Sequence, residues 1–438
     1  MSSKATFRKH LSLPGMLAQA RRAFQAIPDQ VTRCQIPLVD HLMSGLALFG
    51  LKYASLLQFD NDSRQDDIGR HNLRTLYGIK TAPCDTRLRE RLDQVDPTSL
   101  RRVYRELFAA LQRGKGLEGF EALDGHYALS VDGTGVFSSQ KIHCDQCCEK
   151  RHRNGQVTYY HQMLGAVLVH PEHREVFPLA PEPILKQDGQ RKNDCERNAA
   201  KRLLTSLRRE HPHLKFIVVE DALASNGPHI KQLKSLNYRF ILGAKPRDHT
   251  ALFHWVETSE ATQTWCHTDE QGIQHRFRYH HAVPLNDTHF SLAVNFIEYW
   301  ETQPNGKTQR FSWVTDLPLS EVCLMQIMRI GRARWRIENE TFNTLKNQGY
   351  QFEHNFGHGH QHLTTVLMHV MMLAFLIDQI QQRCCHLFQQ GIKKMGSKTR
   401  FWRKLRERFN SLLIADWETL YLSLAYKLKP VPMVIDTS

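Results

Sequence analysis

Three acidic residues stand at positions where a carboxylate is costly. Asp132 interrupts the β-prone run "ALSVDGTG", and Asp221 ends the apolar run "FIVVED". Glu338 lies in the helical segment "RARWRIENETFNTLK", on a stripe of apolar residues. Burying a carboxylate is unfavourable unless a neighbouring group compensates its charge. Two compensations are open here: a buried salt bridge from Arg334, or a divalent cation that the three acids share.

A second glutamate in the same segment, Glu340, has to be told apart from Glu338. On a helix with about 100° per residue, Glu340 falls about 200° away from Glu338. Phe342 and Leu345 lie on the side of Glu338, whereas Arg336 precedes Glu340 by four residues. We therefore predict that Glu340 forms an ordinary surface ion pair with Arg336 and that Glu338 faces the protein body.

Three inward carboxylates from distant parts of the chain would suit an oxygen-ligated Mg²⁺ or Mn²⁺. Two such ions side by side can activate a water or hydroxyl and stabilise the leaving oxygen of a phosphodiester. The chain carries a net charge of +14 and has a pI of about 9.3. That balance favours a polyanionic partner, nucleic acid before membrane, over a merely solubilising surface.

The secondary structure expected around these acids changes along the chain from helical to strand-rich. Up to about residue 120 the apolar residues recur at helical spacing. From Asp124 the pattern predicts three strands, a helix, a buried strand, a helix and another strand, which favours a mixed sheet with helices on its faces. Residues 250–312 are again strand-like, and "SEVCLMQIMRIGRARWRIENETFNTLK" predicts one long helix with Ser320 as its N-cap.

The sequence does not indicate a membrane protein. The opening "MSSKATFRKH" is polar and basic and lacks the apolar core of a signal peptide. The most apolar run, residues 364–377, is shorter than the roughly 20 residues of a membrane span, so we expect a buried helix. With ten cysteines and no export signal, we expect reduced thiols in the cytoplasm.

A cysteine-rich stretch, "KIHCDQCCEKRH", has the Cys-x-x-Cys spacing of a structural zinc site. The expected ligands are Cys144, Cys147, Cys148 and His152. Because no second Cys-x-x-Cys pair exists, the set must close locally or recruit one further residue: His143, His161 or Cys195. The alternative is a hairpin that carries ordinary reduced thiols.

The segment that contains Glu338 resembles the signature helix of DDE transposases from bacterial insertion sequences, in the group named for a Tyr-Arg-Glu-Lys motif. The resemblance rests on "RWRIE" from Arg334 to Glu338, with Lys346 further on, and on "SVDGTG" and "FIVVEDALASNGPHIKQLKSLNYRFILGAK" as the two aspartate units. It covers roughly residues 124 to 350. Two departures are visible: Gly331 stands where the family has its Tyr, and Lys346 lies eight residues after Glu338, one more than usual.

The resemblance implies an α/β fold with a ribonuclease H-like mixed sheet, helices on both faces, a β-rich insertion and helical terminal regions. The expected organisation is a helical DNA-binding and assembly region at 1–122 and a first part of the catalytic core at 123–249. A β-rich insertion at 250–315, the signature helix of the core at 316–350 and a helical region at 351–438 complete the chain.

The resemblance further implies hydrolysis at transposon ends, which frees a 3′-hydroxyl, and attack of that hydroxyl on target DNA. Asp132, Asp221 and Glu338 would hold two Mg²⁺ (or Mn²⁺) ions. The implied DNA contacts are Arg334 and Lys346 near the scissile phosphate, with Arg336, Lys245 and Trp313, the last as a base-stacking residue beside Trp265 and Trp300. A homodimer or higher oligomer on DNA, in the bacterial cytoplasm at the nucleoid, is the expected assembly.

Two other functions stay open at this point. One is a ribonuclease H-like nuclease that cuts without strand transfer. The other is a non-catalytic DNA-binding relic of a transposase. About 120 residues before the expected core and about 90 after it favour end recognition and assembly over a bare nuclease.

Overall fold

The computed structural model describes residues 10–29, 31, 35–186 and 193–426 of the 438-residue chain. These residues form two compact units. Unit 1 combines the two ends of the chain, Met1–Gly116 and Thr344–Ser438, and unit 2 is the middle segment, Leu117–Asn343. Asp132, Asp221 and Glu338 all belong to unit 2.

One continuous mixed sheet runs through unit 2, with the strand order β2-β3-β1-β6-β7-β11-β10-β9-β8. In its first half, β1 and β3 are long antiparallel partners, and β6 and β7 continue the sheet parallel to β1. This hairpin followed by two parallel additions is the order expected of a ribonuclease H-like core, so the predicted fold class is confirmed. The strands are β1 (Tyr127–Ser139), β2 (Cys148–Arg151), β3 (Val157–Val169), β6 (Phe216–Glu220) and β7 (Arg239–Gly243), with β4 (Phe177–Pro178) and β5 (Glu182–Ile184) beside β3.

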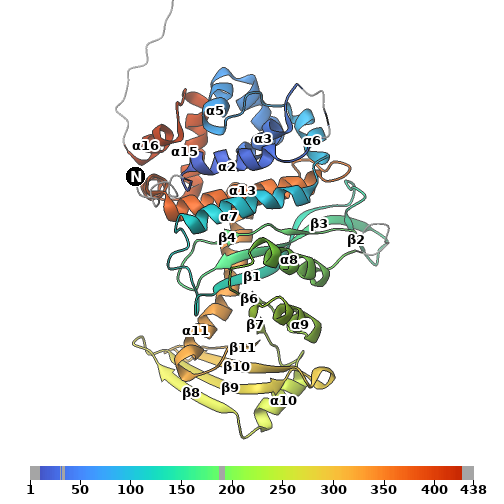
Figure 1. Ribbon diagram of the computed structural model, residues 1–438, viewed down its shortest axis with the longest axis vertical. Helices are drawn as coiled ribbons and strands as arrows, with labels where there is room; N and C mark the ends of the chain where they lie inside the picture. Colours follow the sequence, from blue (N-terminus) through green and yellow to red (C-terminus); the bar gives the residue numbers. More distant parts are fainter. Residues whose placement is uncertain (1–9, 30, 32–34, 187–192, 427–438) are drawn as a thin grey trace, which may run out of the picture. The chain divides into compact units, whose positions relative to one another are not determined.

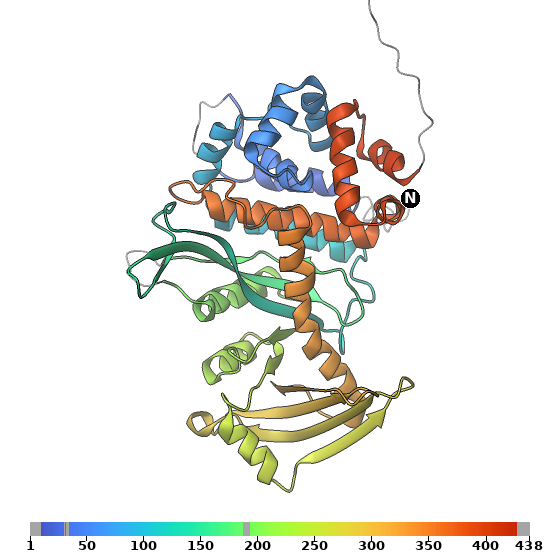
Figure 2. The ribbon, with the colours of Figure 1, turned by 180° about the vertical axis from the view of Figure 1, so that it is seen from behind.

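Helices cover both faces of this half of the sheet. Every residue of β6 is buried, as its unbroken apolar sequence predicts for a strand covered on both sides. The crossover helices α8 (Glu196–Glu210) and α9 (Gly227–Ser235) lie on the face turned to the viewer in Figure 1. Figure 2, seen from behind, shows the helical segment that starts with α11 (Glu321–Arg332) on the opposite face.

The second half of the sheet is the expected β-rich insertion. It consists of β8 (Gln263–Thr268), β9 (Gln274–Pro284), β10 (Ala293–Thr302) and β11 (Thr308–Thr315). All four are antiparallel, and β11 joins the core by pairing with β7, where Trp313 lies opposite Gly243. The strand-like pattern expected from residue 250 is wrong at its start, because Thr250–Thr258 forms helix α10. Phe253 of α10 packs against Phe296 of β10, with ring centroids 5.0 Å apart.

The long signature helix is helical throughout but not regular, so the expectation of one uniform α-helix is wrong. Helix α11 gives way to a 3₁₀ turn, Ala333–Trp335, then to a π-helical turn, Ile337–Phe342, and then to α12, Asn343–Asn347. Ser320 is the N-cap as predicted, and its backbone N–H donates to Cys323 Sγ at 3.2 Å. π-turns of this kind recur at functional sites because they shift side chains off the regular helical spacing.

Unit 1 is helical in its described residues, apart from its loops. Its elements are α2 (Leu13–Gln25), α3 (Leu38–Gly50), α4 (Leu56–Phe59), η1 (Asp60–Gln65), α5 (Asp67–Tyr77), α6 (Asp85–Asp93), η2 (Pro97–Leu100), α7 (Arg101–Arg113), α13 (Leu363–Cys384), α14 (His386–Met395), α15 (Lys398–Ser411) and α16 (Trp417–Ala425). Among the described residues, α13 alone is long and apolar enough to cross a membrane, and its most apolar window is wholly buried. The helix expected over residues 364–377 is therefore the core helix of unit 1.

A buried ion pair ties two distant segments of unit 1 together. The Lys52 ammonium lies 2.7 Å from Asp378 Oδ2, and both side chains are almost wholly buried. The hydroxyl of Tyr350 also donates to Asp378. The ammonium sits 4.0 Å from the ring centres of Tyr350 and Trp402, an additional favourable placement for a cation. Removing either charge would leave the other buried without its partner.

Candidate active site

Asp132 sits in the middle of β1, on the central part of the sheet. In the β1–β3 ladder it lies opposite Gly165. One of its carboxylate oxygens accepts a hydrogen bond from the Gly133 backbone N–H at 2.9 Å, and the other lies 3.0 Å from Arg334 Nη1. The carboxylate is thus held in place from its own strand and from the helical segment that contains Arg334.

The two glutamates have the ion-pair partners that helical spacing predicts, but Glu338 is not the more buried of the two. Arg334 Nη1 lies 3.3 Å from Glu338 Oε1, so a single guanidinium bridges Glu338 and Asp132. Glu340 instead pairs with Arg336 at 3.8 Å, the predicted i,i+4 pair. The two side chains are similarly exposed, at 37% for Glu338 and 31% for Glu340. What distinguishes them is that the arginine beside Glu338 also contacts Asp132.

A glycine lets the π-turn approach the sheet closely enough for Glu338 to reach Asp132. A Cβ atom on Gly165 would lie 3.2 Å from the ring of Phe342 and 3.6 Å from the side chain of Ile337. Both apolar residues belong to the π-turn and are buried. Because Gly165 is the ladder partner of Asp132, the same contact that seats the π-turn brings Glu338 over Asp132.

Asp221 directly follows β6, at the carboxyl end of a parallel strand. Its Oδ1 accepts from the Leu223 backbone N–H at 2.9 Å, which fixes the carboxylate at the start of the turn. Asp221 lines two cavities of unit 2. It shares one, of about 760 Å³, with Asp132, and the other, of about 390 Å³, with Arg334. Both aspartates therefore open onto one space, and the arginine that bridges Asp132 and Glu338 borders the adjoining one.

A fourth carboxylate, Glu196, joins this group and was missed in the sequence. It is the first residue of α8 and lines the larger cavity with Asp132 and Asp221. Its Oε1 lies so close to Gly133 that a Cβ atom there would collide with it, so only glycine leaves the carboxylate that position. At sequence level Glu196 was an ordinary acid in the first turn of a helix. The one signal in the sequence was the glycine after Asp132 in "SVDGTG". A glycine there indicates that another group packs closely against the strand, but it does not say which residue supplies that group.

Two of the acids, Asp132 and Glu196, are held in an environment that disfavours their charge. Burial raises the pKa of Asp132 to about 7; Arg334 opposes this shift, and Glu338 adds to it. Burial also raises the pKa of Glu196, and the negative charge of Asp221 adds to that effect. One guanidinium between two carboxylates cannot neutralise both. An all-oxygen donor set with raised pKa values fits a hard divalent cation, which would stabilise the ionised forms.

The expected DNA-contacting cations are placed in different ways. Arg334 bridges the carboxylates of Asp132 and Glu338. Lys245 is exposed and borders the smaller cavity. Arg336 donates to the Pro171 carbonyl at 2.6 Å in addition to its pair with Glu340. Lys346 lies in unit 1, where its ammonium is 2.8 Å from Glu353. Of the expected cations, Arg334 and Lys245 thus border a cavity that Asp221 also lines.

Trp313, expected to stack on a base, borders the smaller cavity but is only 6% exposed and packs inside unit 2. Its indole lies against Gly331: a Cβ there would be 2.8 Å from Trp313 Cε2. The ring thus occupies the space beside the position where the related signature has its Tyr. On a regular helix Trp335 would lie on the same side as Glu338, three residues later, but it is 50% exposed, because the 3₁₀ and π turns break the regular helical spacing. Its ring lies under the Arg334 guanidinium at 4.7 Å and borders the smaller cavity.

Gly331→Ala is expected to destabilise the protein, because the new methyl group would collide with the buried indole of Trp313. Overpacking of this kind costs about 1–3 kcal/mol, which exceeds the gain of up to about 1 kcal/mol from replacing glycine within a helix. Urea denaturation should therefore show a lower midpoint. Gly135→Ala is the matched control, since its Cβ would meet nothing within 4 Å. Equal midpoints for both variants would contradict the steric account.

The four expected zinc ligands are not gathered in one place. Cys148 Sγ points to the Ile184 carbonyl at 3.6 Å, and His152 Nε2 is hydrogen bonded to Thr158 at 2.8 Å in the hairpin turn. Cys144 and Cys147 do lie together, with His161. Cys148, the first residue of β2, directs its sulfur to the Ile184 carbonyl of β5 instead.

Comparison with known proteins adds a family to this geometry. The family model of the transposase DDE domain matches residues 125–376, more than half of the chain. No curated protein matches. Among solved structures, a similar chain is that of the piggyBac transposase synaptic complex with hairpin DNA, at 10% identity over 99% of this chain and 87% of that chain. Its TM-score of 0.39 is too low for the likeness to bear on fold or function.

Proposed function

Because this chain belongs to the transposase DDE domain family, we propose that it is the DNA transposase of a bacterial insertion sequence. It would cleave at the ends of the element and join the freed 3′-hydroxyl to target DNA. The observation that carries the proposal is the convergence, within unit 2, of acids from three distant segments. Asp132 and Glu338 meet at one guanidinium, and Asp132 and Asp221 border one cavity.

We assign Asp132, Asp221 and Glu338 as the ligands of two Mg²⁺ or Mn²⁺ ions. The donor set fits, since it consists of carboxylates, and burial raises the pKa of Asp132 among them. When bound, such ions supply a nucleophilic water or hydroxyl and stabilise the leaving oxygen. Arg334 orients Asp132 and Glu338 and holds them close despite their like charge. Fixed backbone bonds to Asp132 and Asp221 keep both carboxylates in place.

The smaller cavity is the proposed approach for the scissile strand. Lys245 and Trp335 border it with Asp221 and Arg334. An exposed lysine is suited to a phosphate as a point charge, and a half-exposed indole is suited to stacking on a base. We propose Trp335, in place of the buried Trp313, as the stacking residue. The net charge of +14 supports DNA as the partner.

Glu196 is proposed to support the ligands from the first turn of α8. Glu196→Gln should lower DNA cleavage about 10- to 100-fold, as loss of a supporting carboxylate at a metal site typically does. It should also raise the Mg²⁺ concentration that gives half-maximal rate, a readout that a purely structural role would not move. Gly133→Ala should do the same, because its methyl group would displace the Glu196 carboxylate.

Glu172→Gln is the matched control for that measurement, since Glu172 is exposed and borders neither cavity. An unchanged Mg²⁺ dependence for both Glu196→Gln and Gly133→Ala would remove Glu196 from the site.

The test of the proposed function is a cleavage and joining assay on DNA that carries the two flanks of the gene. Terminal inverted repeats bordered by short direct repeats in those flanks are expected. With Mg²⁺ the protein should release a 3′-hydroxyl end and join it to a second DNA. Cleavage without joining would favour a nuclease, and binding without cleavage would favour a non-catalytic relic.

Two further proposals have their own tests. Gel filtration of the protein with end DNA checks the proposed dimer or higher oligomer. Fractionation of the host cell checks the proposed location in the cytoplasm.

A further inference from the structure

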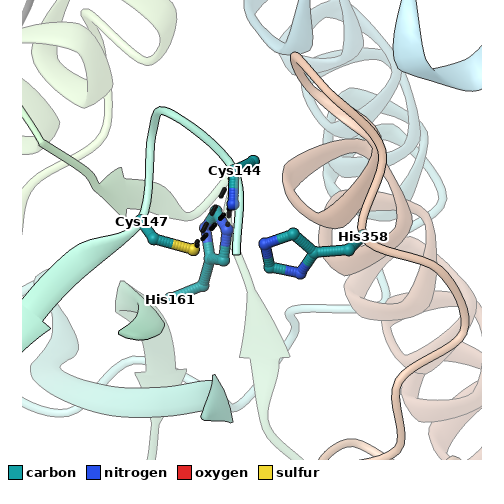
Figure 3. A group of neighbouring side chains, drawn as sticks. All are labelled: Cys144, Cys147, His161 and His358. Atoms are coloured by element: carbon teal, nitrogen blue, oxygen red, sulfur yellow. Dashed lines mark hydrogen bonds between the residues drawn. The ribbon is translucent and has the colours of Figure 1, made fainter. Parts of the chain in front are cut away.

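A second group of metal-binding side chains lies in unit 2, apart from the acids. Cys144, Cys147 and His161 point toward one another, as Figure 3 shows. Their ligand atoms lie within 4.8 Å of one another. Cys144 Sγ is 3.9 Å from Cys147 Sγ and 3.4 Å from His161 Nε2. His358, which Figure 3 also labels, belongs to unit 1, so the candidate site is defined by the three residues of unit 2.

The local backbone explains why these three side chains meet. Residues 144–147 form a tight turn before β2, closed by a hydrogen bond from the Cys147 N–H to the Cys144 carbonyl at 3.1 Å. The backbone N–H of Cys144 also donates a hydrogen bond to Cys147 Sγ, at 3.4 Å. His161 comes from the middle of β3, where it lies opposite Phe137 of β1. The turn is thus placed over a fixed strand position.

The spacing matches that of ligands around one zinc ion. With Zn–S near 2.3 Å and Zn–N near 2.0–2.1 Å, a tetrahedral site puts two sulfurs about 3.8 Å apart and a sulfur and a nitrogen about 3.6 Å apart. The two distances here, 3.9 and 3.4 Å, lie on either side of those values. A disulfide, with its sulfurs about 2.0 Å apart, is not present and would not account for the histidine.

The environment also points to a bound cation. Cys147 and His161 are almost wholly buried, at 1% and 4% exposure. Two sulfurs and an imidazole nitrogen lie around one point in this environment. A divalent ion bound there would hold its sulfur ligands as thiolates.

We propose that Cys144, Cys147 and His161 bind a structural zinc ion. The mixed sulfur and imidazole donors select zinc over Mg²⁺ or Mn²⁺, which prefer oxygen, so this site is chemically distinct from the carboxylates. Water or a side chain from another part of the chain completes the coordination. The ion pins the 144–147 turn to β3 and so orders the connection from β1, the strand of Asp132, to β2. The proposal does not depend on the transposase activity.

The experiment measures zinc in the purified full-length protein by elemental analysis, followed by replacement with Co²⁺. About one zinc per chain is expected, and the Co²⁺ form should show the strong near-ultraviolet charge-transfer band of thiolate ligands. Cys144→Ser and Cys147→Ser should each bind less than a tenth of the zinc of the wild type. Cys148→Ser, one residue along with its sulfur on a backbone carbonyl, should retain it. No zinc in the wild type, or equal loss in Cys148→Ser, would overturn the proposal.

A second measurement needs no variant and so does not depend on variant folding. Alkylation of the wild-type protein, read by mass spectrometry, should be slow at Cys144 and Cys147 and become at least about tenfold faster after a chelator removes the ion. The exposed Cys266 serves as an internal control and should react equally with and without chelator. Alkylation of Cys144 and Cys147 that the chelator leaves unchanged would overturn the proposal.

Discussion

Glu338→Gln is expected to reduce DNA cleavage by about 10³-fold or more, while Glu340→Gln stays within about threefold of the wild type. Loss of a carboxylate that holds a catalytic divalent ion removes several kcal/mol of transition-state stabilisation, and about 4 kcal/mol corresponds to about 10³ in rate. The two glutamates are two residues apart and similarly exposed, so the pair is a matched comparison. Glu340 keeps only an i,i+4 pair with Arg336, which is worth a few tenths of a kcal/mol.

The measurement is single-turnover cleavage of end DNA at saturating Mg²⁺, with DNA binding measured in parallel. Binding should be retained in both variants, which assigns the loss in Glu338→Gln to the chemical step. Full activity of Glu338→Gln together with loss in Glu340→Gln would reverse the assignment. Asp132→Asn and Asp221→Asn should behave like Glu338→Gln.

Lys52→Met is expected to destabilise unit 1 by about 3–5 kcal/mol at neutral pH, the usual cost of stripping a buried ion pair of one partner. Asp378 would keep the Tyr350 hydroxyl but lose its only counter-ion among the described salt bridges. Burial raises the pKa of Asp378 in the folded protein. Lys52 opposes this shift, so the folded pKa of Asp378 should be higher still in the variant. The loss of stability relative to the wild type should therefore shrink as the pH falls from the variant's pKa toward that of the wild type.

Urea denaturation at neutral and acidic pH checks this expectation. Lys115→Met is the control, because Lys115 has the same left-handed backbone as Lys52, with φ of 60° against 59°, but is exposed. Its effect should stay within about 0.5 kcal/mol. The double variant Lys52→Met/Asp378→Leu should recover much of the loss, since no charge is left buried. A deficit that is the same at every pH would contradict the charge-based explanation.

The order of the main elements along the chain was predictable from the sequence because its signals are local and strong, whereas the short strands β2 and β5 were not predicted. The unbroken apolar run "FIVVE" predicted a strand buried on both faces, which β6 is. A core helix was expected after residue 363, but α13 is longer than the apolar run suggested, and its burial rather than its length identifies it as a core helix. Helix α10 was missed because "TALFHWVET" is rich in β-branched and aromatic residues, and its packing against β10 overrides that propensity.

In the candidate site, only the contacts between residues close in sequence could be predicted. The Glu338–Arg334 and Glu340–Arg336 pairs follow from helical spacing and are present. The position of Trp335 did not follow, because a wheel with uniform spacing fails across 3₁₀ and π turns. Glu196 belongs to α8 and His161 to β3. Only the tertiary fold brings Glu196 close to Asp221 and His161 close to Cys144.

The central claim is that Asp132, Asp221 and Glu338 form one divalent-cation site, and affinity cleavage tests it most directly. Fe²⁺ replaces Mg²⁺, ascorbate and peroxide generate hydroxyl radicals at the bound iron, and mass spectrometry maps the cuts in the chain. The prediction is cutting near all three acids, suppressed by excess Mg²⁺ and lost in Glu338→Gln. Cutting that avoids these segments, or that Mg²⁺ and Glu338→Gln leave unchanged, would contradict it.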